Sequence, residues 1–352
     1  MMEIKTGFPF HGKDLDELRS FLAANALKYD EQIDFSLCLV EDNKIAASGS
    51  LDGNVLKCIA VSKDFQNEGL AARIVSGLID QAARNGSFHL FIFTKPENES
   101  LFGGLGFYPL AKTAGVLLME NKKNGITDFV ASIAQASGKA AVSRTTNAAD
   151  GTAKGGTAKS GAAGTTGAIV MNCNPFTNGH QYLIESAASR CDLLYVFVVS
   201  ENRSAFPSDV RFDLVKAGTA HIPNVRVHPT GPYLISAATF PDYFLKDTVK
   251  SENVNTTLDL TIFAEHFAKP LGISRRFVGT EPLDPVTESY NRRMKDFLPR
   301  YTIEVVEIER LKKDGNVISA GRVRELLAES RMEEIRELVP PATFAYLKSR
   351  RG

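Results

Sequence analysis

The sequence lacks tryptophan, an excess of either charge, and cysteine pairs of the kind that bind metals. Its 41 Lys and Arg residues balance 41 Asp and Glu residues, so the formal net charge is zero. Non-specific nucleic-acid binding requires a basic surface, and the composition gives no support for a nucleic-acid partner. The four cysteines form no C-x-x-C pair, which argues against a zinc or redox motif and fits a reducing compartment; they are Cys38, Cys58, Cys173 and Cys191.

Long apolar segments are also absent. The first residues, MMEIKTG, lack the charged start and apolar core of a secretory signal peptide. No apolar run approaches the length of about 20 residues that spans a membrane. We therefore expect a cytoplasmic protein without a membrane partner. A chain of 352 residues, 43% hydrophobic and 23% charged, has the composition and length of two globular domains.

A low-complexity segment at residues 136–167 divides the chain. Of its 32 residues, 25 are Ala, Gly, Ser or Thr, and Val142 is its only larger aliphatic residue. Such a segment cannot bury enough apolar area to offset its chain entropy. We expect a flexible linker between a domain at residues 1–135 and a domain at residues 168–352.

The first domain combines strand patterns with a glycine-bearing turn. Strands are expected at 35–40, 45–51 and 55–61. Gln66, Gly69 and Ala71 then form a Q-x-x-G-x-A motif before a helical pattern at 72–84. A backbone turn at a helix start suits a pyrophosphate group.

This motif resembles the acyl-CoA-binding motif of the GNAT family of N-acetyltransferases, and the Leu-Gly-Phe turn at 105–107 resembles the same fold. The resemblance implies a mixed-sheet domain that binds a CoA-like ligand through Gln66, Gly69 and Ala71. Family members often carry a tyrosine as general acid where this chain has Phe102, which has no hydroxyl to donate. Acetyl transfer by this domain alone is therefore not expected. The alternative is that Gly69 only permits a tight turn.

The second domain opens on an apolar run, 168–171, followed by a turn, 172–179, and a helical pattern that begins at His180. Free N–H groups at such a helix start bind phosphate. The stretch resembles the Thr/His-x-Gly-His signature of the nucleotidyltransferase superfamily. This resemblance implies that His180 and Thr177 hold the α-phosphate of a nucleotide, with further contacts from Asn174, Phe176 and Gly179. The alternative is that His180 is an ordinary helix-capping residue.

A second phosphate motif lies near the end of the chain. Ser319 is a natural N-cap, and Arg322 and Arg324 lie in the first turns of the helix that follows. The stretch resembles the Ile-Ser-x-Thr/Ser-x-x-Arg signature of the same superfamily, with Gly321 in place of the usual hydroxyl residue. It implies that these residues hold the β- and γ-phosphates and the leaving pyrophosphate. The alternative is a capped amphipathic helix with solvated arginines.

Strands and helices alternate through the second domain, which predicts a doubly wound parallel sheet with ligands at the carboxyl ends of its strands. Arg211, Gly279 and Glu281 follow two of these strands and are further candidates for nucleotide contacts. Strands are expected at 193–199, 225–228, 276–279 and 302–310, and helices at 208–220, 239–252, 258–267, 288–298, 319–330 and 332–339.

Both domains together resemble the citrate lyase ligase family, through these motifs and the segments 200–207, 231–241 and 277–287. The resemblance implies that acetate and ATP form acetyl-AMP and pyrophosphate, and that the acetyl group passes to a thiol on the citrate lyase acyl-carrier subunit. That thiol ends a CoA-like prosthetic arm, which the first domain would hold. Mg²⁺ would be bound mainly by the phosphates, and the loop 231–241 is the candidate acetate pocket. A nucleotidyltransferase acting on a phosphorylated acceptor and a non-catalytic CoA- and nucleotide-binding module remain alternatives.

Overall fold

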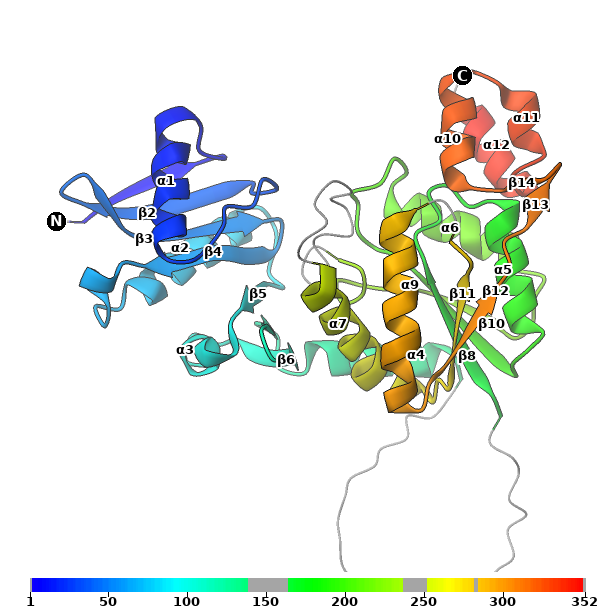
Figure 1. The fold of residues 1–352 in the computed structure, drawn as a ribbon, viewed down its shortest axis with the longest axis horizontal. Coiled ribbons are helices and arrows are strands. Elements are labelled where there is room, and N and C mark those ends of the chain that lie inside the picture. Colours follow the sequence, from blue (N-terminus) through cyan, green and yellow to red (C-terminus); the bar gives the residue numbers. More distant parts are fainter. Residues whose placement is uncertain (1, 139–163, 237–251, 282–283, 351–352) are drawn as a thin grey trace, which may run out of the picture. The chain divides into compact units, whose positions relative to one another are not determined.

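A computed structural model describes residues 2–138, 164–236, 252–281 and 284–350. The chain divides into two compact units, residues 1–125 and residues 126–352 apart from 237–239, drawn in blue to cyan and in cyan to red (Figure 1). Most of the predicted linker and most of the predicted helix at 239–252 lie outside the described residues. No helix in the described ranges combines the length and apolar character needed to cross a membrane.

In the described part of the first unit, seven strands form one sheet in the order β1-β2-β3-β4-β5-β7-β6. β4 and β5 are its only parallel neighbours, and they pair only where Val55 and Leu56 face Phe91 and Ile92, so the two strands diverge beyond that point. The mixed sheet confirms the fold class expected for this part of the chain. The strands are β1 (Glu3–Gly7), β2 (Phe35–Glu41), β3 (Lys44–Asp52), β4 (Val55–Val61), β5 (Phe91–Thr94), β6 (Tyr108–Lys112) and β7 (Leu117–Glu120).

The helix α2 (Leu70–Arg84) covers one face of this sheet with an apolar stripe that includes Leu70, Ile74 and Leu78. It approaches β3 so closely that a Cβ on Gly49 would lie 2.4 Å from a methyl group of Ile74. A second cluster lies beneath α1 (Gly12–Ala24). The remaining helices of the unit are η1 (Lys63–Phe65), η2 (Pro96–Asn98) and α3 (Glu99–Gly103).

In the second unit, the described strands form a sheet of five parallel strands in the order β10-β9-β8-β11-β12. The chain adds β9 and then β10 on one side of β8. It then adds β11 and β12 on the other side of β8. The strand order therefore reverses between β8 and β11, where doubly wound sheets bind ligands. This topology confirms the predicted fold. The strands are β8 (Thr166–Met171), β9 (Leu193–Val198), β10 (Val225–Pro229), β11 (Arg275–Gly279) and β12 (Glu304–Ile308).

Helices cover both faces of this sheet. α5 (Asn178–Ala188) and α6 (Ser208–Thr219) bury one face, where Ile184 and Val215 pack against Ile169, Val196 and Phe277. The opposite face carries α4 (Gly125–Ala136), the π-helix η4 (Phe263–Ala268) and α9 (Pro285–Phe297).

Helix α4 shows that the second unit begins before the predicted boundary at residue 135. Its Phe129 ring lies 5.3 Å from Tyr233 and 6.2 Å from Phe267, measured between ring centroids. Ser137 also lies 3.0 Å from the His228 ring on β10, between Oγ and Nε2. Burial of this apolar helix face ties residues 126–138 to the second unit.

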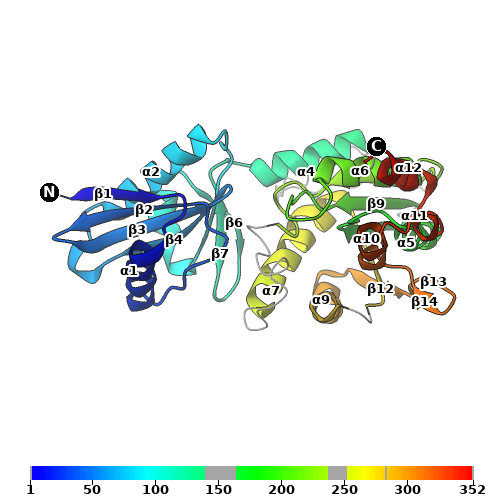
Figure 2. The same ribbon diagram turned by 90° about the horizontal axis from the view of Figure 1, so that it is seen from above.

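The C-terminal helices form a small cluster of their own. Phe206 packs with Val323, Leu326, Ile335 and Leu347. Figure 2 shows the C-terminal helices grouped near α5 and α6. These helices are α10 (Ala320–Ala328), α11 (Met332–Arg336) and α12 (Pro341–Ser349), preceded by the short hairpin β13 (Lys312–Lys313) and β14 (Asn316–Val317). The other elements of this unit are α7 (Glu252–Ile262), α8 (Lys269–Leu271) and η5 (Leu298–Tyr301).

Candidate active site

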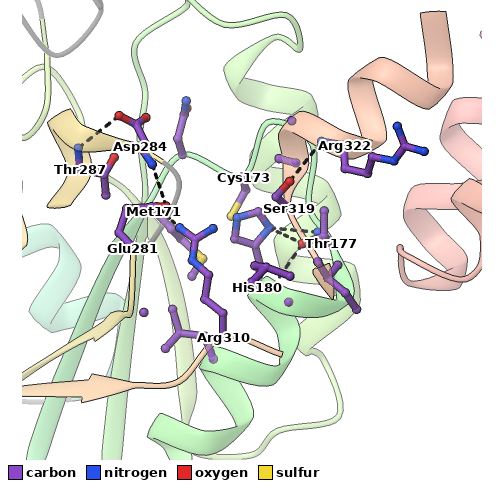
Figure 3. A pocket seen from close by; sticks show the side chains of 18 of the residues that line it. Met171, Cys173, Thr177, His180, Glu281, Asp284, Thr287, Arg310, Ser319 and Arg322 are labelled. Atoms are coloured by element: carbon purple, nitrogen blue, oxygen red, sulfur yellow. Dashed lines mark hydrogen bonds and ion pairs between the residues drawn. The ribbon is translucent and has the colours of Figure 1, made fainter. Parts of the chain in front are cut away.

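A cleft of about 1820 Å³ opens outside the carboxyl ends of β8 and β11, at the point where the strand order reverses. Its walls come from the turn after β8, the segments after β11 and β12, and the start of α10. Figure 3 shows Thr177 and His180 on one side of the cleft, Glu281 and Asp284 on the other, and Arg310 between them. The cleft lies within the second unit.

Thr177 and His180 form a reciprocal cap at the start of α5. Thr177 is the N-cap residue, and its Oγ1 accepts the His180 backbone N–H at 3.4 Å. The His180 ring returns the interaction, because its Nδ1 accepts the Thr177 backbone N–H at 3.0 Å. The Phe176 ring stacks nearly parallel to the imidazole, with centroids 5.9 Å apart. These contacts fix the ring orientation.

The cap also determines which ring nitrogen carries the proton. Because Nδ1 of His180 accepts a backbone N–H, the neutral ring bears its hydrogen on Nε2. Burial, and then the positive charge of Arg310, lower the pKa of His180 to about 4. At neutral pH His180 is therefore an uncharged N–H donor in the cleft wall.

The second motif meets the first directly. Ser319 caps α10, and its Oγ accepts the Arg322 backbone N–H at 3.1 Å. A Cβ on Gly179 would lie only 2.8 Å from the carbonyl oxygen of Ile318, so a glycine is needed where the two turns touch. Two helix N-termini thus face one cleft, an arrangement suited to an anion with several phosphates.

Positive side chains converge on these helix starts. Arg310, which follows β12, pairs with Glu281 across the cleft. Nη1 of Arg324 donates to the Asn174 carbonyl at 2.5 Å, which ties the second motif to the turn after β8. Arg310 ends the predicted strand 302–310, but it was not among the predicted site residues. Other cationic side chains of the cleft wall are Arg203, Arg276, Arg292, Lys312, Lys313 and Arg322.

Nine of the predicted nucleotide-site residues line this cleft together, although they span about 150 positions of the chain. Their convergence does not test the role of any one of them. They are Asn174, Thr177, Gly179, His180, Gly279, Glu281, Ser319, Arg322 and Arg324. The loop predicted to hold acetate contributes Ile235 to the wall, and its residues 237–241 lie outside the described ranges.

Two predicted site residues do not reach the cleft wall. Phe176 is fully buried beneath α6, where a Cβ on Gly218 would lie 2.4 Å from its ring. Arg211 is also fully buried, and its guanidinium donates to backbone carbonyls of Asn172 and Val199 at 2.8 Å each. It donates further to the carbonyls of Phe206 and Glu201.

These contacts correct the predicted role of Arg211. Its donors are taken up by main-chain oxygens of the turns after β8 and β9, so it supports the cleft from behind instead of binding a ligand. Gln66, Gly69 and Ala71 lie in the first unit, after η1 and at the start of α2. Gly69 is the N-cap of α2 and has a φ of 71°, a conformation that favours glycine.

Comparison with known proteins identifies the family. The family described as "Citrate lyase ligase C-terminal domain" matches residues 166–347. A [citrate [pro-3S]-lyase] ligase of Escherichia coli K12 is 40% identical over 343 residues, which cover 96% of this chain and 91% of that protein. The chain belongs to the citrate lyase ligase family. A second relative of that name, from Klebsiella pneumoniae, is 39% identical over 93% of this chain and 90% of its own length. Members of the family are ligases, and the chain is therefore an enzyme.

Solved structures show weaker similarity to this citrate lyase ligase family member. The structure of Escherichia coli ElaA matches along all of its own chain and covers 35% of this chain, with 13% identity and a TM-score of 0.31. Thermotoga maritima TmcAL bound with alpha-thio ATP matches 53% of this chain and 55% of its own, with 16% identity and a TM-score of 0.35. Similarity at these TM-scores assigns no ligand to the chain.

Proposed function

We propose that the second unit activates acetate with ATP, and that the acetyl group then passes to the thiol of the citrate lyase acyl carrier. In the first step an acetate oxygen attacks the α-phosphorus, the bond to the bridging oxygen breaks, and pyrophosphate leaves acetyl-AMP. In the second step the carrier thiolate attacks the acetyl carbon and AMP leaves. The observation that carries the proposal is the meeting of two helix N-termini beside a neutral histidine donor.

Each group has a role that follows from its charge. The Nε2–H of His180 and the hydroxyl of Thr177 hold the α-phosphate, where negative charge develops during attack. Ser319 with the start of α10, Arg322 and Arg324 hold the other phosphates and the departing pyrophosphate. Mg²⁺ would be held mainly by the phosphates and would offset their charge, since no group of three His, Cys, Asp or Glu residues in the described ranges is arranged to hold a metal by itself.

The first unit would hold the CoA-like arm of the carrier. α2 follows β4 and η1, and its N-cap residue Gly69 offers no side chain to cap it, so the first N–H groups of the helix could bind a pyrophosphate. Phe102 is buried, with 2% of its surface exposed, and it offers no acid for a leaving thiol. In this proposal the first unit delivers the thiol and the second unit performs the chemistry.

Acetate-dependent exchange of pyrophosphate into ATP tests the first step. Replacing His180 by Ala should lower the exchange rate by about 10²–10³-fold, the usual effect of losing one donor to a developing oxyanion. The matched control is His221→Ala, since His221 pairs with Glu185 and lies outside the cleft wall. A normal rate for the His180 variant would remove His180 from the mechanism. Exchange that requires a phosphate monoester in place of acetate would favour the nucleotidyltransferase alternative.

Dephospho-CoA binding tests the role of the first unit. In the full-length protein, Gly69→Glu places a carboxylate at the start of α2 and should weaken dephospho-CoA binding at least tenfold. The same variant should leave acetate-dependent exchange unchanged, because that step uses only the second unit. Unchanged dephospho-CoA binding in this variant, or no binding by the wild type, would contradict the assignment.

A further inference from the structure

The cleft wall includes side chains from the sheet face that carries α4, η4 and α9, and we call this part of the cleft its arm. Strand alternation places Val170 and Val278 on the face opposite Ile169 and Phe277, which pack beneath α5 and α6. Val170 and Val278 line the same cavity as His180. Other residues of this arm are Ile235, Tyr290, Met294 and Arg276.

Arg276 lies at the inner part of the arm. It is the second residue of β11, three positions before Gly279 at the strand end, or roughly 10 Å along the strand. Only 3% of its surface is exposed. Among the described residues, Nε and Nη1 of Arg276 find no hydrogen-bond acceptor. The guanidinium lies over the Phe263 ring, with Cζ 4.6 Å from the ring centroid.

A buried cation without acceptors is costly for a folded protein. Burial lowers the pKa of Arg276, but a guanidinium stays charged at any pH at which proteins are folded. The negative charge of Asp259 acts on Arg276, and the Asp259 oxygens accept the Ile235 N–H and the Tyr290 hydroxyl at 2.7 Å each. Asp259 therefore offsets the charge of Arg276 without occupying its donors.

We propose that Arg276 binds the carboxylate of the acetate substrate in this arm. The inference rests on the proposed function, since it supplies the acetate site of that reaction. A guanidinium presents parallel N–H groups that match a carboxylate, and the apolar side chains of Val170 and Val278 suit a methyl group. Both carboxylate oxygens accept from Arg276, and one of them uses a remaining lone pair, on the side of the cleft, to attack the α-phosphorus. The P–O bond to pyrophosphate breaks as the new P–O bond forms, and no proton moves in this step.

Kinetics of acetate-dependent pyrophosphate exchange on the full-length protein test the assignment. Arg276→Met removes the charge at similar length and should raise the KM for acetate at least 100-fold, while the KM for ATP changes less than about threefold. Arg276→Lys keeps the charge but loses the paired donors and should give an intermediate value. Arg275→Met is the matched control, because Arg275 pairs with Glu304 and the Arg190 carbonyl outside the cavity. It should keep the wild-type KM for acetate.

Thermal unfolding separates a ligand-binding role from a structural one. Arg276→Met removes a buried cation whose Nε and Nη1 lack acceptors, but it also leaves the buried Asp259 without that opposing charge, so its unfolding temperature should stay close to that of the wild type. Sodium acetate should raise the unfolding temperature of the wild type, relative to sodium chloride, and leave that of Arg276→Met unchanged.

The outcomes distinguish this inference from the proposed function. A wild-type KM for acetate in both Arg276 variants overturns the inference and leaves the proposed function intact. Loss of stability in both variants, with the KM values for acetate and ATP changed together, assigns Arg276 a structural role and also overturns it. If the wild type shows no acetate-dependent exchange, the proposed function fails. An acetate-specific thermal shift that requires Arg276 would then still support the carboxylate site.

Discussion

Acidifying the ligand-free protein should leave the His180 imidazole neutral until about pH 4. Its pKa is lowered from 6.5 to about 4 by burial and by Arg310. In the unfolded chain the same ring takes up a proton below about pH 6.5. The difference of about 2.5 units corresponds to about 3 kcal/mol at 1.36 kcal/mol per unit.

The sign follows from which state binds the proton. Above pH 6.5 neither state is protonated, and His180 adds no pH dependence to stability. As the pH falls from 6.5 toward 4, the unfolded chain gains a proton that the folded protein does not, so the free energy of unfolding decreases. At pH 5 the loss amounts to about 2 kcal/mol, and it reaches its full value below about pH 4.

Two measurements check this prediction. NMR of protein labelled with ¹⁵N-histidine, compared with His180→Gln for assignment, should find the His180 ring protonated on Nε2 and without a titration step between pH 5 and 8. Urea unfolding gives the free energy of unfolding at pH 7.5 and at pH 5. The decrease between these two pH values should be about 2 kcal/mol larger for the wild type than for His180→Gln. A His180 ring that titrates near 6.5, or carries its proton on Nδ1, would refute the reasoning from the cap and from burial.

Two further predictions concern the scaffold of the cleft. In Gly179→Ala, the new Cβ would lie 2.8 Å from the Ile318 carbonyl oxygen, so the two motifs must move apart. We expect a stability loss of about 1–3 kcal/mol in urea unfolding and a larger proportional loss of exchange activity; unchanged activity would mean that the contact is not needed. Arg211→Met should cost at least about 3 kcal/mol, because it leaves the carbonyls of Asn172 and Val199, among others, without their donor. A loss below about 1 kcal/mol would contradict the structural role assigned to Arg211.

Features that depend on local pattern could be read from the sequence. The turn that ends in Gly179 and His180 is encoded by neighbours in the chain, and so is the N-cap Ser319. The hydrophobic runs that became β8, β9 and β11 are similarly local. For this reason the doubly wound fold could be predicted from local pattern, whereas the nine cleft residues also required the resemblance to known families.

Features that depend on distant partners could not be read in this way. Arg211 resembles a phosphate ligand in sequence, and only the backbone oxygens that surround it reveal a structural residue. Helix α4 looks like the end of the first domain until Phe129 meets Tyr233 and Phe267. Arg276 sits in a short strand beside another arginine, and its burial depends on residues of η4 and α9 that are far from it in the chain.

The neutral state of His180 affects how much more strongly this cleft would bind the transition state than the bound substrates. In the proposed reaction, the cationic side chains around His180 would attract a triphosphate whether or not reaction occurs, and such uniform binding does not speed the chemical step. Burial, and then the charge of Arg310, lower the pKa of His180, so the ring contributes a dipole instead of another charge. A fixed N–H donor gains most where negative charge increases during attack on the α-phosphorus. A protonated His180 would instead add to the binding of ATP and pyrophosphate alike, and it would slow release of the product. The electrostatics of the ligand-free cleft therefore favour a His180 ring that stays uncharged down to about pH 4.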